Sequence, residues 1–133
     1  MSRILLDTHL LLWAVAEPRK LPPAARKRID EAEVFVSAAS IWEVSIKAAL
    51  GKLAADPAEL LAEIEPAGFM LLPVTGEHAA AVARLPRLHA DPFDRMLVAQ
   101  AKTEPLLLLT NDSALTAYGE CVELVVSKPR RAE

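Results

Sequence analysis

Short apolar runs alternate along the chain with stretches in which apolar residues recur every three or four positions. The runs predict strands at residues 3–6, 34–36, 69–74, 106–109 and 122–126. The periodic stretches predict helices at residues 9–16, 20–32, 37–50, 58–65, 77–85 and 91–102. Pro18 and Pro86 each follow a predicted helix, and Gly51 is placed to end another. The pattern therefore predicts strands and helices in alternation.

The predicted strands are apolar at consecutive positions, and the four leucines at 106–109 are the clearest case. Such strands are buried on both faces, which is typical of a parallel sheet between helical layers. We therefore predict an α/β fold, a three-layer α/β/α sandwich around a mostly parallel five-stranded sheet. The length of 133 residues suits one domain. We place this domain at residues 1–127 and expect the short basic tail at 128–133 to be mobile.

Composition and charge narrow the classes of protein that fit this pattern. The chain is 53% hydrophobic but only 5% aromatic, so its core must be mostly aliphatic. The net charge of −3 argues against a strong nucleic-acid binder, unless a metal ion neutralises a local cluster of carboxylates. Cys121 has no partner for a disulfide, and we find neither a signal peptide nor a membrane-spanning stretch. We expect a cytoplasmic protein that does not enter a membrane.

Two carboxylates stand where predicted strands end. Asp7 directly follows the first strand, and Asp112 follows the fourth after only Thr110 and Asn111. In a parallel α/β sheet the carboxyl ends of the strands share one edge, and ligands gather there. We therefore expect both carboxylates on the same edge of the sheet.

Two further acids lie near the starts of predicted helices. Glu43 is in the first turns of the helix at 37–50, and Asp94 is near the start of the helix at 91–102. Helices that follow strands begin at the same edge of the sheet, so these acids are expected to converge with the first two. Asp91 lies three residues before Asp94 on the same helical face and is a fifth candidate.

Carboxylates gathered at one place repel one another, and burial increases the repulsion. A hard divalent cation relieves it, and Mg²⁺ or Mn²⁺ prefers oxygen ligands of this kind. Because the set contains no Cys or His, zinc is disfavoured. Such an ion lowers the pKa of a bound water and stabilises charge on a phosphoryl oxygen. The chemistry that this predicts is phosphodiester hydrolysis, with a metal held by Asp7, Glu43, Asp94 and Asp112.

Each acid taken alone also has a purely structural interpretation. Capping of a helix is that interpretation for Asp7, Asp91 and Asp112. Thr8 is an alternative cap that would free Asp7. Glu43 precedes Lys47 by four residues, which is the favourable spacing for an ion pair within a helix.

Four segments, in this order, carry a resemblance to a known family: ILLDTHLLL, SAASIWEVSIKAALGKL, DPFDRMLVAQA and LLTNDSAL. They resemble the PIN-domain ribonucleases, and most closely the VapC toxins of toxin–antitoxin pairs. The resemblance runs from residue 3 to about residue 126. Position by position, the acids of the family fall on Asp7, Glu43, Asp94 and Asp112. The small polar residue before its last acid falls on Thr110 or Asn111.

The resemblance implies a Mg²⁺- or Mn²⁺-dependent endoribonuclease that acts as a toxin and is inhibited by a cognate antitoxin. RNA, the antitoxin and a second copy of the chain are the expected partners. The apolar helical segments at 10–15 and 41–50 are candidate surfaces for a homodimer or an antitoxin. The alternative is a catalytically inactive PIN-like module that binds a metal or a partner.

Other side chains near the acids are candidates for auxiliary roles. The auxiliary set comprises Thr8, Asp91, Thr110 and Asn111. Lys47 and Arg95 are the candidates for phosphate contacts. Trp42 has the spacing of a core residue, with stacking on RNA as the alternative. His9 is expected on the surface of its helix rather than as a catalytic base.

Two unrelated functions fit the first acid but not the rest of the chain. A phosphatase of the haloacid-dehalogenase type also has an Asp after its first strand, but it needs a second Asp two residues later, where this chain has His9. A receiver module needs an acidic pair before its first strand and a phosphorylatable Asp in mid-chain, and neither is evident.

Overall fold

Five parallel strands form one sheet in the order β3-β2-β1-β4-β5, so the first strand of the chain is the central one. The computed structural model describes residues 2–125, and both the predicted tail at 128–133 and residue 126 lie outside that range. The strands are β1 Ser2–Leu6, β2 Ala32–Ser37, β3 Met70–Leu72, β4 Leu107–Thr110 and β5 Val122–Leu124. The predicted α/β fold with a parallel five-stranded sheet is confirmed.

Helices connect the strands, close to the predicted positions. The α-helices are α1 Thr8–Ala16, α2 Pro23–Asp30, α3 Ala38–Ala49, α4 Pro57–Ile64, α5 Gly76–Ala81 and α6 Pro92–Thr103. Three 3₁₀ helices accompany them: η1 Pro18–Lys20, η2 Val82–Arg84 and η3 Ser113–Tyr118. The helix predicted at 77–85 is thus α5 continued by η2, and η3 was not predicted. No helix within residues 2–125 has the length and apolar character needed to cross a membrane.

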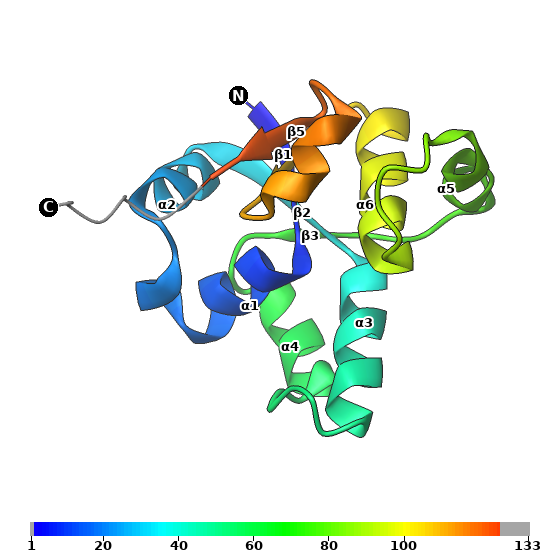
Figure 1. Cartoon of the computed structure of the whole chain (residues 1–133). Helices are drawn as coiled ribbons and strands as arrows, with labels where there is room; N and C mark the ends of the chain where they lie inside the picture. Colours follow the sequence, from blue (N-terminus) through cyan, green and yellow to red (C-terminus); the bar gives the residue numbers. More distant parts are fainter. Residues whose placement is uncertain (1, 126–133) are drawn as a thin grey trace, which may run out of the picture.

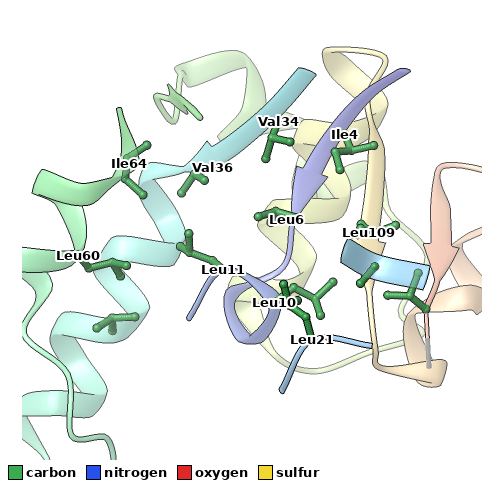
Figure 2. Close-up of a cluster of buried hydrophobic side chains, with 13 residues drawn as sticks. Ile4, Leu6, Leu10, Leu11, Leu21, Val34, Val36, Leu60, Ile64 and Leu109 are labelled. Carbon is green, nitrogen blue, oxygen red and sulfur yellow. The ribbon is translucent and has the colours of Figure 1, made fainter. Parts of the chain in front are cut away.

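Alternate residues of the central strands face opposite helical layers. Ile4 and Leu6 belong to a core with α1, α2 and α4, whereas Leu5 packs with α6 and η3 on the other face. Figure 1 shows α1, α2 and α4 on one side and α5 and α6 on the other. Figure 2 shows the first of these cores, in which Leu60 and Ile64 of α4 point toward the side chains of β1, β2 and α1. Burial on both faces explains why the strands are continuously apolar.

The carboxyl ends of the two central strands are tied together. The N–H of Asp7 donates to the carbonyl of Leu109 at 3.0 Å, which continues the β1–β4 pairing one residue beyond β1. On the other side of β4, the N–H of Val125 donates to the carbonyl of Thr110 at 2.7 Å. The residues that follow β1 and β4 are therefore fixed to the sheet.

Candidate metal site

Asp7 is nearly enclosed at the end of β1, with only 4% of its surface exposed. It caps α1, because its Oδ1 accepts from the N–H of Leu10 at 2.9 Å. Its Oδ2 accepts from the hydroxyl of Thr110. Burial raises the pKa of Asp7 in spite of these hydrogen bonds. Asp7 is therefore a rigid carboxylate whose negative charge is unfavourable where it lies.

Thr8 and Glu43 are joined across α1 and α3. The hydroxyl of Thr8 donates to Oε1 of Glu43 at 2.7 Å and lies 2.9 Å from the hydroxyl of Ser40. Oε2 of Glu43 accepts from the ammonium group of Lys47 at 2.6 Å, so the predicted helical ion pair is present. The expectation that Thr8 takes over the cap of α1 is wrong, because Asp7 keeps that role and Thr8 turns toward Glu43.

Asp112 and Asp7 share Thr110 as a link. Oδ1 of Asp112 accepts from the N–H of Ala114 and so caps η3. The N–H of Asp112 donates to the hydroxyl of Thr110 at 3.0 Å, and this fully buried hydroxyl in turn donates to Asp7. The hydroxyl of Thr110 therefore joins the end of β1, at Asp7, to the end of β4, at Asp112.

Asp91 and Asp94 open α6, where they play different parts. Oδ1 of Asp91 accepts from the N–H groups of Phe93 at 2.8 Å and Asp94 at 3.1 Å, so Asp91 is the cap of the helix. Asp94 lies in the first turn, with its side chain 22% exposed and its Oδ2 3.6 Å from Nε2 of His89. The capping interpretation of Asp91 is confirmed.

His89 completes the group, although it is not among the site residues predicted from the sequence. Its Nε2 lies 3.6 Å from Oδ2 of Asp94 and 3.6 Å from Oδ2 of Asp112. The ligand atoms of these three residues all lie within 4.8 Å of one another. Its place in the sequence could have indicated this role, because His89 lies two residues before Asp91, the cap of α6, and five before Asp94.

Burial and the negative charges of several acids raise the pKa of Asp94. Burial is the main cause that raises the pKa of Asp94 to about 7, and the negative charge of Asp91 adds to it. Glu43 and Asp7 raise this pKa further, whereas His89 lowers it. The acids from β1, α3 and α6 therefore interact at one place, and a cation would relieve the repulsion.

Arg95, one of the two candidates for phosphate contacts, braces the chain that precedes α6. Its Nη1 donates to the carbonyl of Pro86 at 2.9 Å and to the hydroxyl of Tyr118 at 3.2 Å. Its Nη2 donates to the carbonyl of Val82 at 3.1 Å. A phosphate contact at Arg95 would therefore share a guanidinium that already binds three acceptors.

Trp42 is not a core residue, so that interpretation is wrong. Its side chain on α3 is 63% exposed, and its ring meets Phe93 of α6 edge-on, with the centroids 5.2 Å apart. Both rings line an apolar groove of about 590 Å³ together with residues such as Val74 and Met96. The helical spacing was correct, but it places Trp42 between two helices at the surface. His9 is exposed, as expected.

A parallel sheet with acids gathered at its carboxyl edge defines the class of protein as an α/β domain with an acidic site. Comparison with known proteins makes the assignment specific, because the family model described as PIN domain matches residues 4–120. The chain belongs to the PIN-domain family.

The relatives agree with this assignment. Ribonuclease VapC22 of Mycobacterium tuberculosis is 31% identical over 126 residues, which cover 89% of this chain and 93% of the relative. The crystal structure of VapBC2 from Rickettsia felis, bound to a DNA fragment from its promoter, matches with a TM-score of 0.68 at 11% identity and covers 95% of this chain and 99% of that chain. FitAcB from Neisseria gonorrhoeae matches with a TM-score of 0.61 at 25% identity, covering 90% and 95%. The predicted resemblance to PIN domains of the VapC branch is confirmed.

Proposed function

We propose that this chain is a metal-dependent endoribonuclease of the VapC type, the toxin of a toxin–antitoxin pair. Two findings support the proposal. The relative that is 31% identical carries the name Ribonuclease VapC22. The similar solved structures include VapBC proteins and a toxin–antitoxin complex from Klebsiella pneumoniae.

The observation that carries the proposal is the convergence of acids on Asp94. Besides burial, Glu43 on α3 and Asp7 after β1 raise the pKa of Asp94, and a carboxylate oxygen of Asp112 after β4 lies within 4.8 Å of one of Asp94. The pKa of Asp94 rises to about 7 because it is buried among like charges. A fold that needed these carboxylates only as caps would have no reason to bring them within interacting distance, since each added charge is unfavourable there.

The donor set fits a hard divalent ion. Asp7, Asp94 and Asp112 offer carboxylate oxygens, which Mg²⁺ and Mn²⁺ prefer. Each carboxylate oxygen has two lone pairs, so capping a helix with one leaves others for an ion. Mg²⁺ or Mn²⁺, when bound, would lower the pKa of a coordinated water and stabilise negative charge on the phosphoryl oxygens of RNA.

The chain's own residues then have distinct tasks. Asp7, Asp94 and Asp112 would hold the ion, and Thr110 keeps the first and last of these in place. Glu43 would orient water at the edge of the site, since Thr8 and Lys47 fix both of its oxygens. Lys47 is 40% exposed and is the better placed of the two candidates for a phosphate contact.

The partners follow from the same assignment. We propose that a cognate antitoxin inhibits the chain and that two copies form a dimer. The exposed Trp42 and the apolar groove beside it are the surface that we assign to the dimer. Light scattering of the purified chain tests this assignment, because Trp42→Glu should convert a dimer into a monomer.

The proposed activity is tested by RNA cleavage with Mg²⁺, with Mn²⁺ and with a chelator. We expect cleavage by the wild type with either metal, and a loss of at least about 100-fold in Asp94→Asn because an ion ligand is removed. Asp56→Asn is the control, because Asp56 is an exposed aspartate that caps α4 and has no part in the acidic site. Addition of the antitoxin should stop cleavage.

Two results would count against this function. Cleavage that persists in the chelator and in Asp94→Asn would come from another nuclease. Binding of Mn²⁺ without cleavage of any RNA would favour the inactive PIN-like module instead.

A further inference from the structure

We propose that His89 is a positioning residue of the acidic site, whose Nε2–H holds the carboxylates of Asp94 and Asp112 where one hard cation can use both. This inference rests on the proposed function, because it assigns a role toward the same ion. It goes beyond that function by adding a residue from a loop outside the acid set and by stating how this residue acts.

The backbone fixes which nitrogen of His89 carries the proton. The N–H of Asp91 donates to Nδ1 of the ring at 3.1 Å. A backbone N–H is only a donor, so Nδ1 accepts, and the neutral ring carries its proton on Nε2. That N–H therefore faces the two acids.

The position of Nε2 is symmetric between the carboxylates. It lies 3.6 Å from Oδ2 of each, longer than a direct hydrogen bond but close enough for electrostatic attraction. The two carboxylates repel each other, and a shared N–H dipole reduces that repulsion without occupying either oxygen. His89 thus faces the carboxylates of both Asp94 and Asp112, whereas Thr110 joins the carboxylate of Asp7 to the backbone N–H of Asp112.

The loop that carries His89 is held at both ends. At its start, Arg95 binds the carbonyl of Pro86. At its end, Asp91 caps α6 and also supplies the N–H that orients the ring. The ring of His89 is only 20% exposed, so its orientation is further restricted by packing. Asp91 and Arg95, the residues on either side of residues 92–94, therefore hold the loop that carries His89.

The tautomer also decides what His89 is not. Ligation of a metal ion through Nε2 would require the proton to move to Nδ1. There it would face the N–H of Asp91, and that N–H would lose its hydrogen-bond acceptor. The geometry therefore assigns His89 to the second layer around the ion and leaves the ligands as oxygens. Groups of this kind orient ligands, and their loss weakens metal binding.

The test is Mn²⁺ binding to the full chain, measured by electron paramagnetic resonance in the absence of RNA. We expect His89→Ala to bind Mn²⁺ about tenfold more weakly or worse, the usual effect of removing a group that orients the ligands. His89→Gln keeps a side-chain N–H and should retain most of the affinity. Leu88→Ala is the matched control, since Leu88 is the exposed neighbour of His89 in the same loop, and it should bind as the wild type does.

The spin-echo signal of bound Mn²⁺ gives a second readout. We expect no coupling to a directly bound nitrogen in the wild type. Such a coupling, lost in His89→Gln, would overturn the inference by making His89 a ligand.

The binding outcomes separate this inference from the proposed function. Wild-type affinity in His89→Ala, or equal losses in His89→Ala and His89→Gln, would overturn the role of His89 alone. No Mn²⁺ binding by the wild type would overturn the metal site itself and the inference with it. Thermal unfolding verifies that each variant is folded. If His89→Ala does not fold, His89→Leu, which fills the space but has no N–H, takes its place with the same expected loss of affinity.

Discussion

Asp7 and Glu43 are enclosed by donors, whereas Asp94 and Asp112 face each other across a histidine. Both oxygens of Asp7 and both oxygens of Glu43 accept hydrogen bonds from within the protein. Asp94 and Asp112 are more exposed, with side chains 22% and 44% accessible, and their Oδ2 atoms meet only the distant Nε2 of His89 among residues 2–125. The acidic edge therefore has an enclosed half and an open half.

The carboxylates of the two halves differ in what they do for the protein: those of the enclosed half form hydrogen bonds within the fold, and those of the open half carry charge that the fold does not neutralise. The enclosed half is built by folding, because its hydrogen bonds join β1, α1, α3 and β4. The open half leaves its charge unrelieved, as the pKa of about 7 at Asp94 indicates. A residue in the first half should therefore stabilise the fold, and one in the second half should oppose it until a cation binds.

The largest expected effect sets Asp7→Ala against Asp94→Ala. Loss of the cap and of the acceptor for Thr110 should lower the free energy of unfolding by about 2 kcal/mol in Asp7→Ala, after allowing for relief of the buried charge. Asp94→Ala should raise it at pH 8 without metal, because a repelled charge is removed. Urea unfolding in a chelator measures both. If both variants changed the free energy of unfolding in the same direction, the distinction between the enclosed and the open half would be wrong.

The next effect is a dependence of stability on pH. Asp94 has a folded-state pKa of about 7, raised from the ordinary aspartate value of 3.8. The folded chain therefore holds a proton that the unfolded chain releases, and this contribution is complete below about pH 4 and is lost as pH rises through 7. Without metal, the wild type should lose stability relative to Asp94→Asn between pH 4 and pH 8. A constant difference across that range, measured by urea unfolding, would contradict the assignment.

The smallest expected effect tests the link between the halves. Thr110→Val should cost about 1–2 kcal/mol, because it removes the hydroxyl that Asp7 and the N–H of Asp112 share. Thr116→Val is the control, since the Thr116 hydroxyl bonds only a local carbonyl of η3. Mn²⁺ affinity should fall with Thr110→Val and stay unchanged in the control. Equal losses of stability in the two variants would show that Thr110 has no special role.

The strands and most helices could be predicted because their signals are local. The continuous apolar runs mark strands buried on both faces, and Pro57, Pro92 and Gly51 mark helix ends. The parallel sheet then placed the ends of β1 and β4 on one edge. The segment of η3 was missed because a 3₁₀ helix of six residues has too few turns to show a hydrophobic period.

The contacts of the candidate site were harder to predict because they depend on tertiary structure. Nothing local says that Thr8 bonds Glu43, 35 residues away, instead of capping its own helix. His89 lies in a loop, where no periodicity indicates which way a side chain points. Trp42 has the same helical spacing as a core residue, and only the packing of α3 against α6 leaves it at the surface.

The hydrogen bond from Thr110 to Asp7 spans 103 residues. Of the five strands of the sheet, the central strand β1 is made before the others, whereas its neighbour β4 is the fourth. During synthesis, the hydrogen bond from Thr110 to the Asp7 carboxylate can therefore form only after β4 has been made, and contacts of such long range form late. A chain cut short before β4 would lack Thr110 and Asp112 altogether. The acidic site is therefore complete only in a chain whose synthesis has passed β4 and Asp112.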